Sequence, residues 1–279
     1  MGFFKWLNKQ KAKTEKYNNV FKRHRIKLNV KKDPVDERDF LISKISPLKA
    51  EELPTSFSLQ SYCTVIKNQG NLGACTGFSI TGAFEIFRKR DWNEELDTSE
   101  LFSYYNARAI EGTVNQDAGA YIRDICDSGM KDGICLEQFC PYVPQNFAKK
   151  PSWTAYFVAR FFRLKGYYRC YNVQEVKQAL YHGLPVLFGF SVYSNFFDYK
   201  GGIYKEAFGN LAGGHAVCAI AYDDSKNAFL VRNSWGNAWG ESGYFWIDYS
   251  VWSKLLLDAW ALQYTPPNNV VKTALKLLV

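Results

Sequence analysis

Three short segments, far apart in the chain, carry the residue types of a thiol hydrolase. Residues 69–75 read Gln-Gly-Asn-Leu-Gly-Ala-Cys, a second segment contains Gly214-His215, and a third places Asn233 inside Arg-Asn-Ser-Trp-Gly. The thiol comes first, an imidazole follows about half a chain later, and a side-chain amide comes soon after it. This is the order of a nucleophile, its base and the group that orients the base. Since these groups must be brought together by folding, the order predicts one catalytic centre.

Cys75 is predicted to begin a helix over residues 74–90, where apolar residues recur at helical spacing after a glycine-rich loop. The helix dipole and the free amides at that end favour a thiolate, and a nearby histidine can take the proton. The chain has three histidines. His24 lies in a basic segment and His182 at a predicted helix end, so His215, beside a predicted strand, is the candidate base.

Two further side chains fit this chemistry. Asn233, at the end of the next predicted strand, can hold the second ring nitrogen of His215. The backbone amide of Cys75 and the side-chain amide of Gln69 can donate to a developing oxyanion. Trp235 would cover the histidine–asparagine hydrogen bond and exclude water from it.

Longer motifs surround these residues. They read Asn68-Gln69-Gly70-x-x-Gly73-x-Cys75-x-x-Phe78-Ser79, Gly214-His215-Ala216-Val217 and Asn233-Ser234-Trp235-Gly236-x-x-Trp239-Gly240-x-x-Gly243-Tyr244. In this order and spacing they resemble the papain-like cysteine peptidases, and stretches at 36–39, 118–124 and 185–193 resemble the bacterial and viral branch of that family. The resemblance covers residues 33–262.

The resemblance implies roles for the matching residues. Cys75 would be the nucleophile, His215 the general base and acid, Asn233 its orienting partner and Gln69 the oxyanion donor. The family's substrate-binding positions correspond to Ala118, Gly119, Gly189, Gly214, Ala216 and Trp235. Of these, Ala118-Gly119 would pair with the substrate backbone, and the Gly214 carbonyl would accept an N–H from the residue before the scissile bond. The small Gly189 and Ala216 imply a roomy, mainly apolar second specificity pocket.

The expected fold class is α+β. Helices are predicted at 98–110, 119–130 and 173–181 in addition to 74–90, and strands at 186–192, 215–222, 228–232 and 243–248. Helices therefore gather in the first half and strands in the second, which favours two lobes with a site between them. The resemblance implies a papain-like fold with a helical lobe, an antiparallel β-barrel-like lobe and the active-site cleft between the two.

The charge is unevenly distributed. The chain carries a net charge of +8, yet residues 1–32 hold eleven Lys/Arg and one acidic residue, so the remainder is close to neutral. We expect four parts: a basic arm at 1–32, an extended connector or short pro-like segment at 33–52, a catalytic domain at 53–265 and a tail at 266–279. The arm can bind nucleic acid, an acidic protein or an anionic membrane surface, or it can be a solvated tail.

Other classes are disfavoured. No apolar run is long enough to span a membrane, and the start lacks the apolar stretch of a signal peptide, so we expect a cytoplasmic protein, with a virion or delivery into a host as further locations. Leu72 stands where secreted relatives have a disulfide cysteine, and we expect most of the seven cysteines to be reduced. Cys135 and Cys140 flank a predicted turn, which leaves a disulfide between them as the alternative. We expect no cofactor and no metal, since His215 has no second ligand at a suitable spacing.

The sequence thus predicts a cysteine peptidase acting on peptides or proteins through a thioester. A transpeptidase or deamidase would share the same acylation chemistry, and a non-catalytic peptide-binding module would share the fold.

Overall fold

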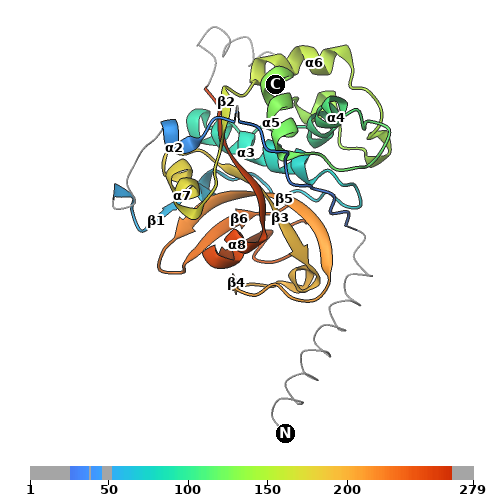
Figure 1. The fold of residues 1–279 in the computed structure, drawn as a ribbon. Helices are drawn as coiled ribbons and strands as arrows, with labels where there is room; N and C mark the ends of the chain where they lie inside the picture. Colours follow the sequence, from blue (N-terminus) through green and yellow to red (C-terminus); the bar gives the residue numbers. More distant parts are fainter. Residues whose placement is uncertain (1–25, 38, 46–51, 266–279) are drawn as a thin grey trace.

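The computed structural model describes residues 26–37, 39–45 and 52–265 of the 279-residue chain. Helices gather in one lobe and the long strands of a sheet in the other (Figure 1). The α+β class is therefore confirmed. The helices are α2 (Ile42–Ile45), α3 (Cys75–Trp92), α4 (Glu100–Ile110), α5 (Ile122–Lys131), α6 (Trp153–Ala159), α7 (Val173–Tyr181) and α8 (Tyr249–Leu255), with short 3-10 turns η2 (Gln60–Tyr62), η3 (Glu137–Phe139), η4 (Pro144–Asn146), η5 (Arg160–Phe162) and η6 (Ser194–Asp198).

Helix α3 lies in the middle of the molecule and is buried on all sides. Every residue from Cys75 to Arg88 is buried, including two charged ones. Glu85 accepts hydrogen bonds from the amide and hydroxyl of Thr98 at 3.1 and 2.8 Å, and Arg88 pairs with Glu94. Because both charges are partnered, the helix can be buried without an uncompensated ion. It ends at Asn93, which adopts a left-handed conformation.

The other predicted helices also form. The helix expected at 98–110 begins at Glu100, because the Ser99 side chain caps it by accepting a hydrogen bond from the Phe102 amide. The helix expected at 119–130 begins three residues later, at Ile122. Helix α7 has the predicted bounds and is capped by Asn172.

One eight-stranded sheet forms the second lobe. The strands are β1 (Ser56–Ser58), β2 (Gly166–Arg169), β3 (Val186–Tyr193), β4 (Ile203–Tyr204), β5 (Leu211–Asp223), β6 (Ala228–Arg232), β7 (Tyr244–Asp248) and β8 (Leu256–Gln263). Their order is β2-β8-β3-β5-β6-β7-β4, with β1 paired to β5. The β3–β5 pair sets Phe190 opposite His215 and Gly189 opposite Ala216, so it carries one wall of the site.

The expected antiparallel, barrel-like lobe needs correction. The strands at the two ends of the order, β2 and β4, do not pair with each other, so the sheet is not closed into a barrel. The β4–β7 pair is also parallel, whereas the other strand pairs are antiparallel. A hairpin forces neighbouring strands to run antiparallel, but β4 and β7 are separated along the chain by β5 and β6, so no hairpin sets their direction.

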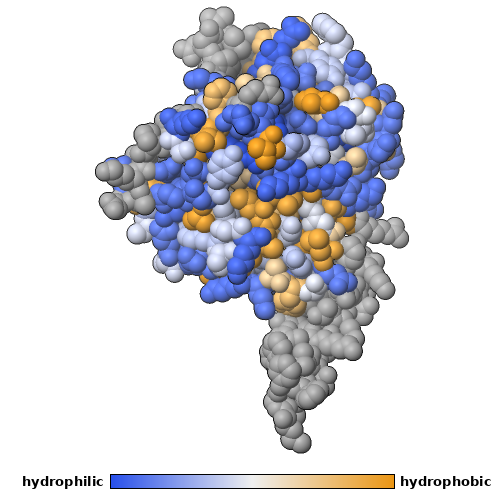
Figure 2. Space-filling view, in the orientation of Figure 1, coloured by the Kyte–Doolittle hydropathy of each residue, from blue (hydrophilic) through white to orange (hydrophobic). Residues whose placement is uncertain are grey.

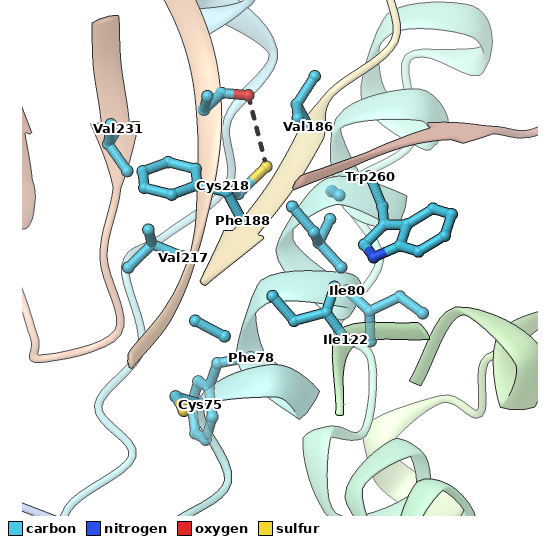
Figure 3. Close-up of a cluster of buried hydrophobic side chains, with 14 of the residues drawn as sticks. Cys75, Phe78, Ile80, Ile122, Val186, Phe188, Val217, Cys218, Val231 and Trp260 are labelled. Carbon is cyan, nitrogen blue, oxygen red and sulfur yellow. Dashed lines mark hydrogen bonds between the residues drawn. The ribbon is translucent and has the colours of Figure 1, made fainter. Parts of the chain in front are cut away.

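The core is continuous between the lobes. Figure 3 shows Ile80 of α3 and Ile122 of α5 on the same side of the sheet as Trp260 of β8, whereas Phe188 of β3 points to the other side, toward Val231. All of them belong to one buried cluster. On the outside, hydrophobic residues appear as separate patches among hydrophilic ones on the face drawn in Figure 2. All seven cysteines are free, so Cys135 and Cys140 form no disulfide.

The segment that precedes the catalytic domain packs on the body where it is described. Leu28 and Val30, from the end of the expected basic arm, belong to the buried core. The expected extended connector contains the short helix α2, which lies between Pro34 and Pro47. The rest of the arm (1–25), residues 38 and 46–51, and the tail at 266–279 lie outside the described residues. Among the helices that the structure describes, none has the length and apolarity to cross a bilayer.

Candidate active site

The candidate nucleophile, Cys75, is the first residue of α3 and is fully buried. Figure 3 shows it at the start of that helix. Burial raises the pKa of the Cys75 thiol to about 11, although the backbone amides of Ala216, Thr76 and Cys75 itself oppose the rise. The amides at the helix start thus favour the thiolate as expected, but desolvation outweighs them, so the pKa of Cys75 is raised overall. Ala216 directly follows His215 in β5, so the backbone next to the candidate base contacts the thiol.

His215 is completely buried in β5 and is held by one hydrogen bond. Its Nε2 lies 2.8 Å from Oδ1 of Asn233, which follows β6. Burial lowers the pKa of His215 to about 4, and the hydrogen bond that its Nε2 donates to Asn233 opposes this shift. The other ring nitrogen, Nδ1, has no hydrogen-bond partner among the described residues. One nitrogen is thus fixed and the other is free to exchange a proton.

Trp235 lies over the histidine. The two rings stack at 4.9 Å between centroids with an angle of 27°. Trp235 is only 6% exposed, because Phe197 stacks on it at 5.3 Å and Trp239 meets it edge-on at 4.9 Å. This aromatic cover keeps water away from the His215–Asn233 hydrogen bond.

Gln69 is tied to the asparagine loop. Its amide oxygen accepts a hydrogen bond from the Ser234 hydroxyl at 2.7 Å, and its backbone amide donates to the Ser234 carbonyl at 2.9 Å. The side-chain nitrogen, Nε2, donates to the Leu72 carbonyl at 3.1 Å, which leaves its second hydrogen for another acceptor. Ser234 was not among the sequence-predicted site residues, although it lies inside the asparagine motif.

The chain's own residues 28–30 lie where a substrate backbone was expected. The Val30 amide donates to the Gly214 carbonyl at 3.0 Å, and Asn29 forms a parallel bridge with Gly214. Gly119 has a left-handed φ of +77°, and a Cβ there would lie 2.7 Å from the Asn29 carbonyl oxygen. A larger residue at 119 would therefore push this segment out of the cleft.

The expected apolar pocket at Gly189 is filled by Val30. A Cβ built on Gly189 would lie 3.2 Å from Val30 Cγ1 and 3.5 Å from Leu257 Cβ. Ile122 lines the same space at 3.0 Å. Two further expected binding residues are Ala118 and Ala216. Ala118 is half-buried beside Gly119, and Ala216 is buried with its backbone at the Cys75 thiol.

A cluster of charged side chains anchors this N-terminal segment to the body. The buried Asp33 accepts a hydrogen bond from Trp260 Nε1 at 2.7 Å, and its own amide donates to Asp258. Asp39 is held at 2.8 Å by Arg123 and at 2.9 Å by Arg169. Burial raises the pKa of Asp258 to about 6, with Asp33 adding to the rise.

A second charged network, which the sequence did not indicate, supports the loop that carries Gln69. The Lys67 ammonium contacts Glu100 at 2.7 Å and Glu85 at 3.1 Å, while the Lys67 carbonyl accepts from the Gly236 amide at 3.1 Å. Arg232 donates to the carbonyls of Thr64 and Val65. These contacts link the loops that carry Gln69 and Asn233 to α3 and α4. A lone lysine and scattered glutamates give no recognisable pattern in the sequence.

Comparison with known proteins decides the family. A family profile described as "Papain family cysteine protease" matches residues 53–256. The chain belongs to the papain family of cysteine proteases. It is 32% identical over 75% of its length to an uncharacterized peptidase C1-like protein of Acanthamoeba polyphaga mimivirus, of which 76% is covered. It is 31% identical over 67% of its length to pro-cathepsin H of Bos taurus, of which 57% is covered.

Solved structures agree. Xylellain, a cysteine protease from Xylella fastidiosa, matches with a TM-score of 0.76 at 34% identity, over 87% of this chain and 98% of that one. The bromelain protease of Ananas comosus, solved with the inhibitor E64, shares the fold with a TM-score of 0.62 at 24% identity, over 76% of this chain and all of that one. The papain-like fold is therefore confirmed, and this papain-family member is a thiol protease, a hydrolase whose substrates are peptides or proteins.

Over the ranges that the structure describes, no three His, Cys, Asp or Glu side chains are grouped in a way that suits a metal ion.

Proposed function

We propose that Cys75 attacks the scissile carbonyl, with His215 as base and acid, Asn233 as the group that orients His215, and Gln69 as an oxyanion donor. The observation that carries this assignment is the 2.8 Å hydrogen bond between His215 Nε2 and Asn233, which leaves Nδ1 without a partner. The backbone amide of the next residue, Ala216, contacts the Cys75 thiol at the start of α3. An imidazole fixed through one nitrogen is what proton transfer through the other requires.

The reaction would proceed in two steps, acylation of Cys75 and hydrolysis of the thioester. The thiol proton moves to Nδ1 of His215 as sulfur bonds to the carbonyl carbon, and the oxyanion accepts hydrogen bonds from the Cys75 amide and from Gln69 Nε2. The leaving amine takes the proton from His215 as the C–N bond breaks, which leaves a thioester. Water then gives a proton to His215, attacks the thioester, and releases a carboxylic acid and the thiol.

The pocket next to Gly189 supports a preference for a branched aliphatic side chain. Its walls are Ile122 and Leu257, and Val30 fits it from the chain's own N-terminal segment. Burying such a side chain contributes about 1.5–3 kcal/mol, which is enough to discriminate against a small or charged one.

Residues 28–30 also keep the site in a resting state. They occupy the backbone partners Gly214 and Gly119, so a substrate must displace them before it binds. Two pKa values agree with a resting site: burial raises that of Cys75 to about 11 and lowers that of His215 to about 4, so both groups are neutral at pH 7.

A digest of a peptide library tests the proposal. The wild-type protein and the Cys75→Ala and Cys140→Ala variants would be compared by mass spectrometry, with Cys140 as a matched thiol in the helical lobe outside the site. We expect cleavage by the wild-type protein and Cys140→Ala, and none by Cys75→Ala. Cleavage by Cys75→Ala would overturn the assignment. Products joined to an added amine, or side-chain amides converted to acids without chain cleavage, would instead indicate a transpeptidase or a deamidase.

A further inference from the structure

A long stretch of the helical lobe carries positive charge alone. Between Glu137 and Glu175 the chain has no Asp or Glu and six Lys/Arg. One of them, Arg169, is buried and pairs with Asp39 and Asp258. The other five, all of them exposed, are Lys149, Lys150, Arg160, Arg163 and Lys165. They flank helix α6 at both ends.

Helix α6 adds an aromatic stripe between these cations. Trp153 is 71% exposed and stacks on Phe157 at 5.2 Å with an angle of 23°. Phe157 meets Phe161 edge-on at 5.5 Å. The opposite side of the helix, with Ala155, Val158 and Ala159, is buried in the lobe. Trp153 therefore lies outside the core, whereas Phe157 and Phe161 are half-buried and pack against it.

The surface continues into a hollow between α4 and α6. Its volume is about 760 Å³. Trp153 and Ile110, which is 43% exposed, line this hollow. Lys150 lines the hollow too, and Asp132 is the acidic residue in its wall. Figure 1 places α6 at the end of the helical lobe away from the sheet. A partner bound there would leave the cleft accessible.

We propose that the α6 surface, defined as Lys149, Lys150, Trp153, Phe157, Arg160 and Arg163, binds an anionic lipid bilayer. Tryptophan at the interface with cations beside it is the composition of segments that lie in the headgroup region. Lysine and arginine draw the surface to acidic headgroups, while the rings and the hydrocarbon of the long side chains enter the interface.

The ring contacts favour a bilayer over a single-stranded nucleic acid. Bases bind by stacking on free aromatic faces. Here one face of Trp153 is already covered by Phe157, and the Arg160 guanidinium lies 5.3 Å from the Phe157 centroid. What remains available is the outer face and edge of Trp153, which suits insertion between headgroups.

Co-sedimentation of the full chain with vesicles tests this proposal. The vesicles are phosphatidylcholine with 30% phosphatidylserine (about that fraction suffices for a negative surface), or phosphatidylcholine alone. The variant Lys149→Gln/Lys150→Gln/Arg160→Gln is compared with the matched triple Lys200→Gln/Lys205→Gln/Lys254→Gln, whose exposed lysines lie in the sheet lobe. Both remove the same charge and leave the basic N-terminal arm unchanged, and peptide cleavage by each checks the fold.

We expect the α6 triple to weaken binding to anionic vesicles by about 10²-fold, since each cation contributes about fivefold, and the matched triple by much less. Brominated lipid should quench tryptophan emission of the wild-type protein more than that of Trp153→Phe. Equal losses in the two triples, or equal quenching with and without Trp153, would overturn the proposal. Loss of oligothymidylate binding by the α6 triple, with unchanged vesicle binding, would assign the surface to nucleic acid instead.

Discussion

The backbone amide of Val30 donates a hydrogen bond to the carbonyl oxygen of Gly214 over 3.0 Å. Gly214 immediately precedes His215, and the resemblance to papain-like peptidases implies that its carbonyl binds substrate. Val30 also fills the apolar space at Gly189. One residue of the N-terminal segment thus occupies both a backbone and a side-chain position of the cleft, and the activity of the full chain should depend on how firmly it is held there.

Val30→Asp should activate the protein. A carboxylate in the space between Ile122 and Leu257 costs several kcal/mol, and each 1.4 kcal/mol shifts the closed-to-open ratio tenfold. We expect kcat/KM for a peptide substrate to rise at least ~10-fold. Val35→Asp makes the same change at a residue that is 89% exposed in the same segment and should leave kcat/KM unchanged. Equal rates for Val30→Asp and the wild-type protein would show that residues 28–30 do not restrict the cleft.

Asp33→Ala should loosen the same segment from its anchor. The substitution removes the acceptor of the Trp260 indole N–H, and a buried donor left without a partner costs about 1–3 kcal/mol. We expect a smaller rise in kcat/KM than for Val30→Asp, together with faster proteolysis of residues 26–37. Glu37→Ala, an exposed neighbour, is the control. A segment that stays as resistant to protease as in the wild-type protein would argue against the anchoring role of Asp33.

Folding stability should report on the charge state of His215. Its pKa is lowered from 6.5 to about 4 by burial, so the unfolded chain binds the proton more readily between these values. Stability should therefore be present in full above pH 6.5 and be lost as the pH falls toward 4, by at most about 3 kcal/mol.

Urea denaturation of the wild-type protein and His215→Gln measures this effect, because other titrating groups cancel in the difference. The wild-type protein should lose stability relative to His215→Gln as the pH falls from 7 to 4.5. A difference that grows in favour of the wild-type protein on acidification would mean that the folded state holds an imidazolium, which would contradict a neutral resting pair.

Asn233→Ala should slow the chemistry more than it weakens binding. Without the 2.8 Å hydrogen bond the imidazole can rotate away, so we expect kcat to fall about 10²-fold with a small change in KM. Asn237→Ala, an exposed asparagine four residues later, should behave as the wild-type protein. A change in KM alone would assign Asn233 to substrate binding instead of orientation.

The sequence was informative where function requires short local motifs. The order of Cys75, His215 and Asn233, and the helix that begins at Cys75, could be predicted because each lies in a distinctive segment with clear periodicity or turn residues. Strand β8 was missed, since Leu256–Gln263 is apolar apart from Asp258 and Gln263, shows no regular alternation, and owes its conformation to pairing with β3. Burial on both faces removes the signal that strand prediction needs.

The residues that occupy the cleft could not be identified from the sequence for a related reason. Residues 27–32 are lysine-rich, which indicates a solvated arm, while the apolar Leu28 and Val30 are too few to define a strand. Their partners, Gly213 and Gly214, lie about 185 residues away along the chain. A pairing of that range depends on the folded cleft and leaves no pattern in the neighbouring residues.

Covalent trapping of Cys75 is the most direct test of the central claim. The wild-type protein, Val30→Asp and Cys75→Ala would be incubated with a peptidyl epoxide, and the adduct located by peptide mapping among the seven cysteines. We predict a single adduct on Cys75, formed faster in Val30→Asp than in the wild-type protein and absent from Cys75→Ala. An adduct on another cysteine, or no adduct on Cys75 even in Val30→Asp, would contradict the claim that Cys75 is the nucleophile of this peptidase.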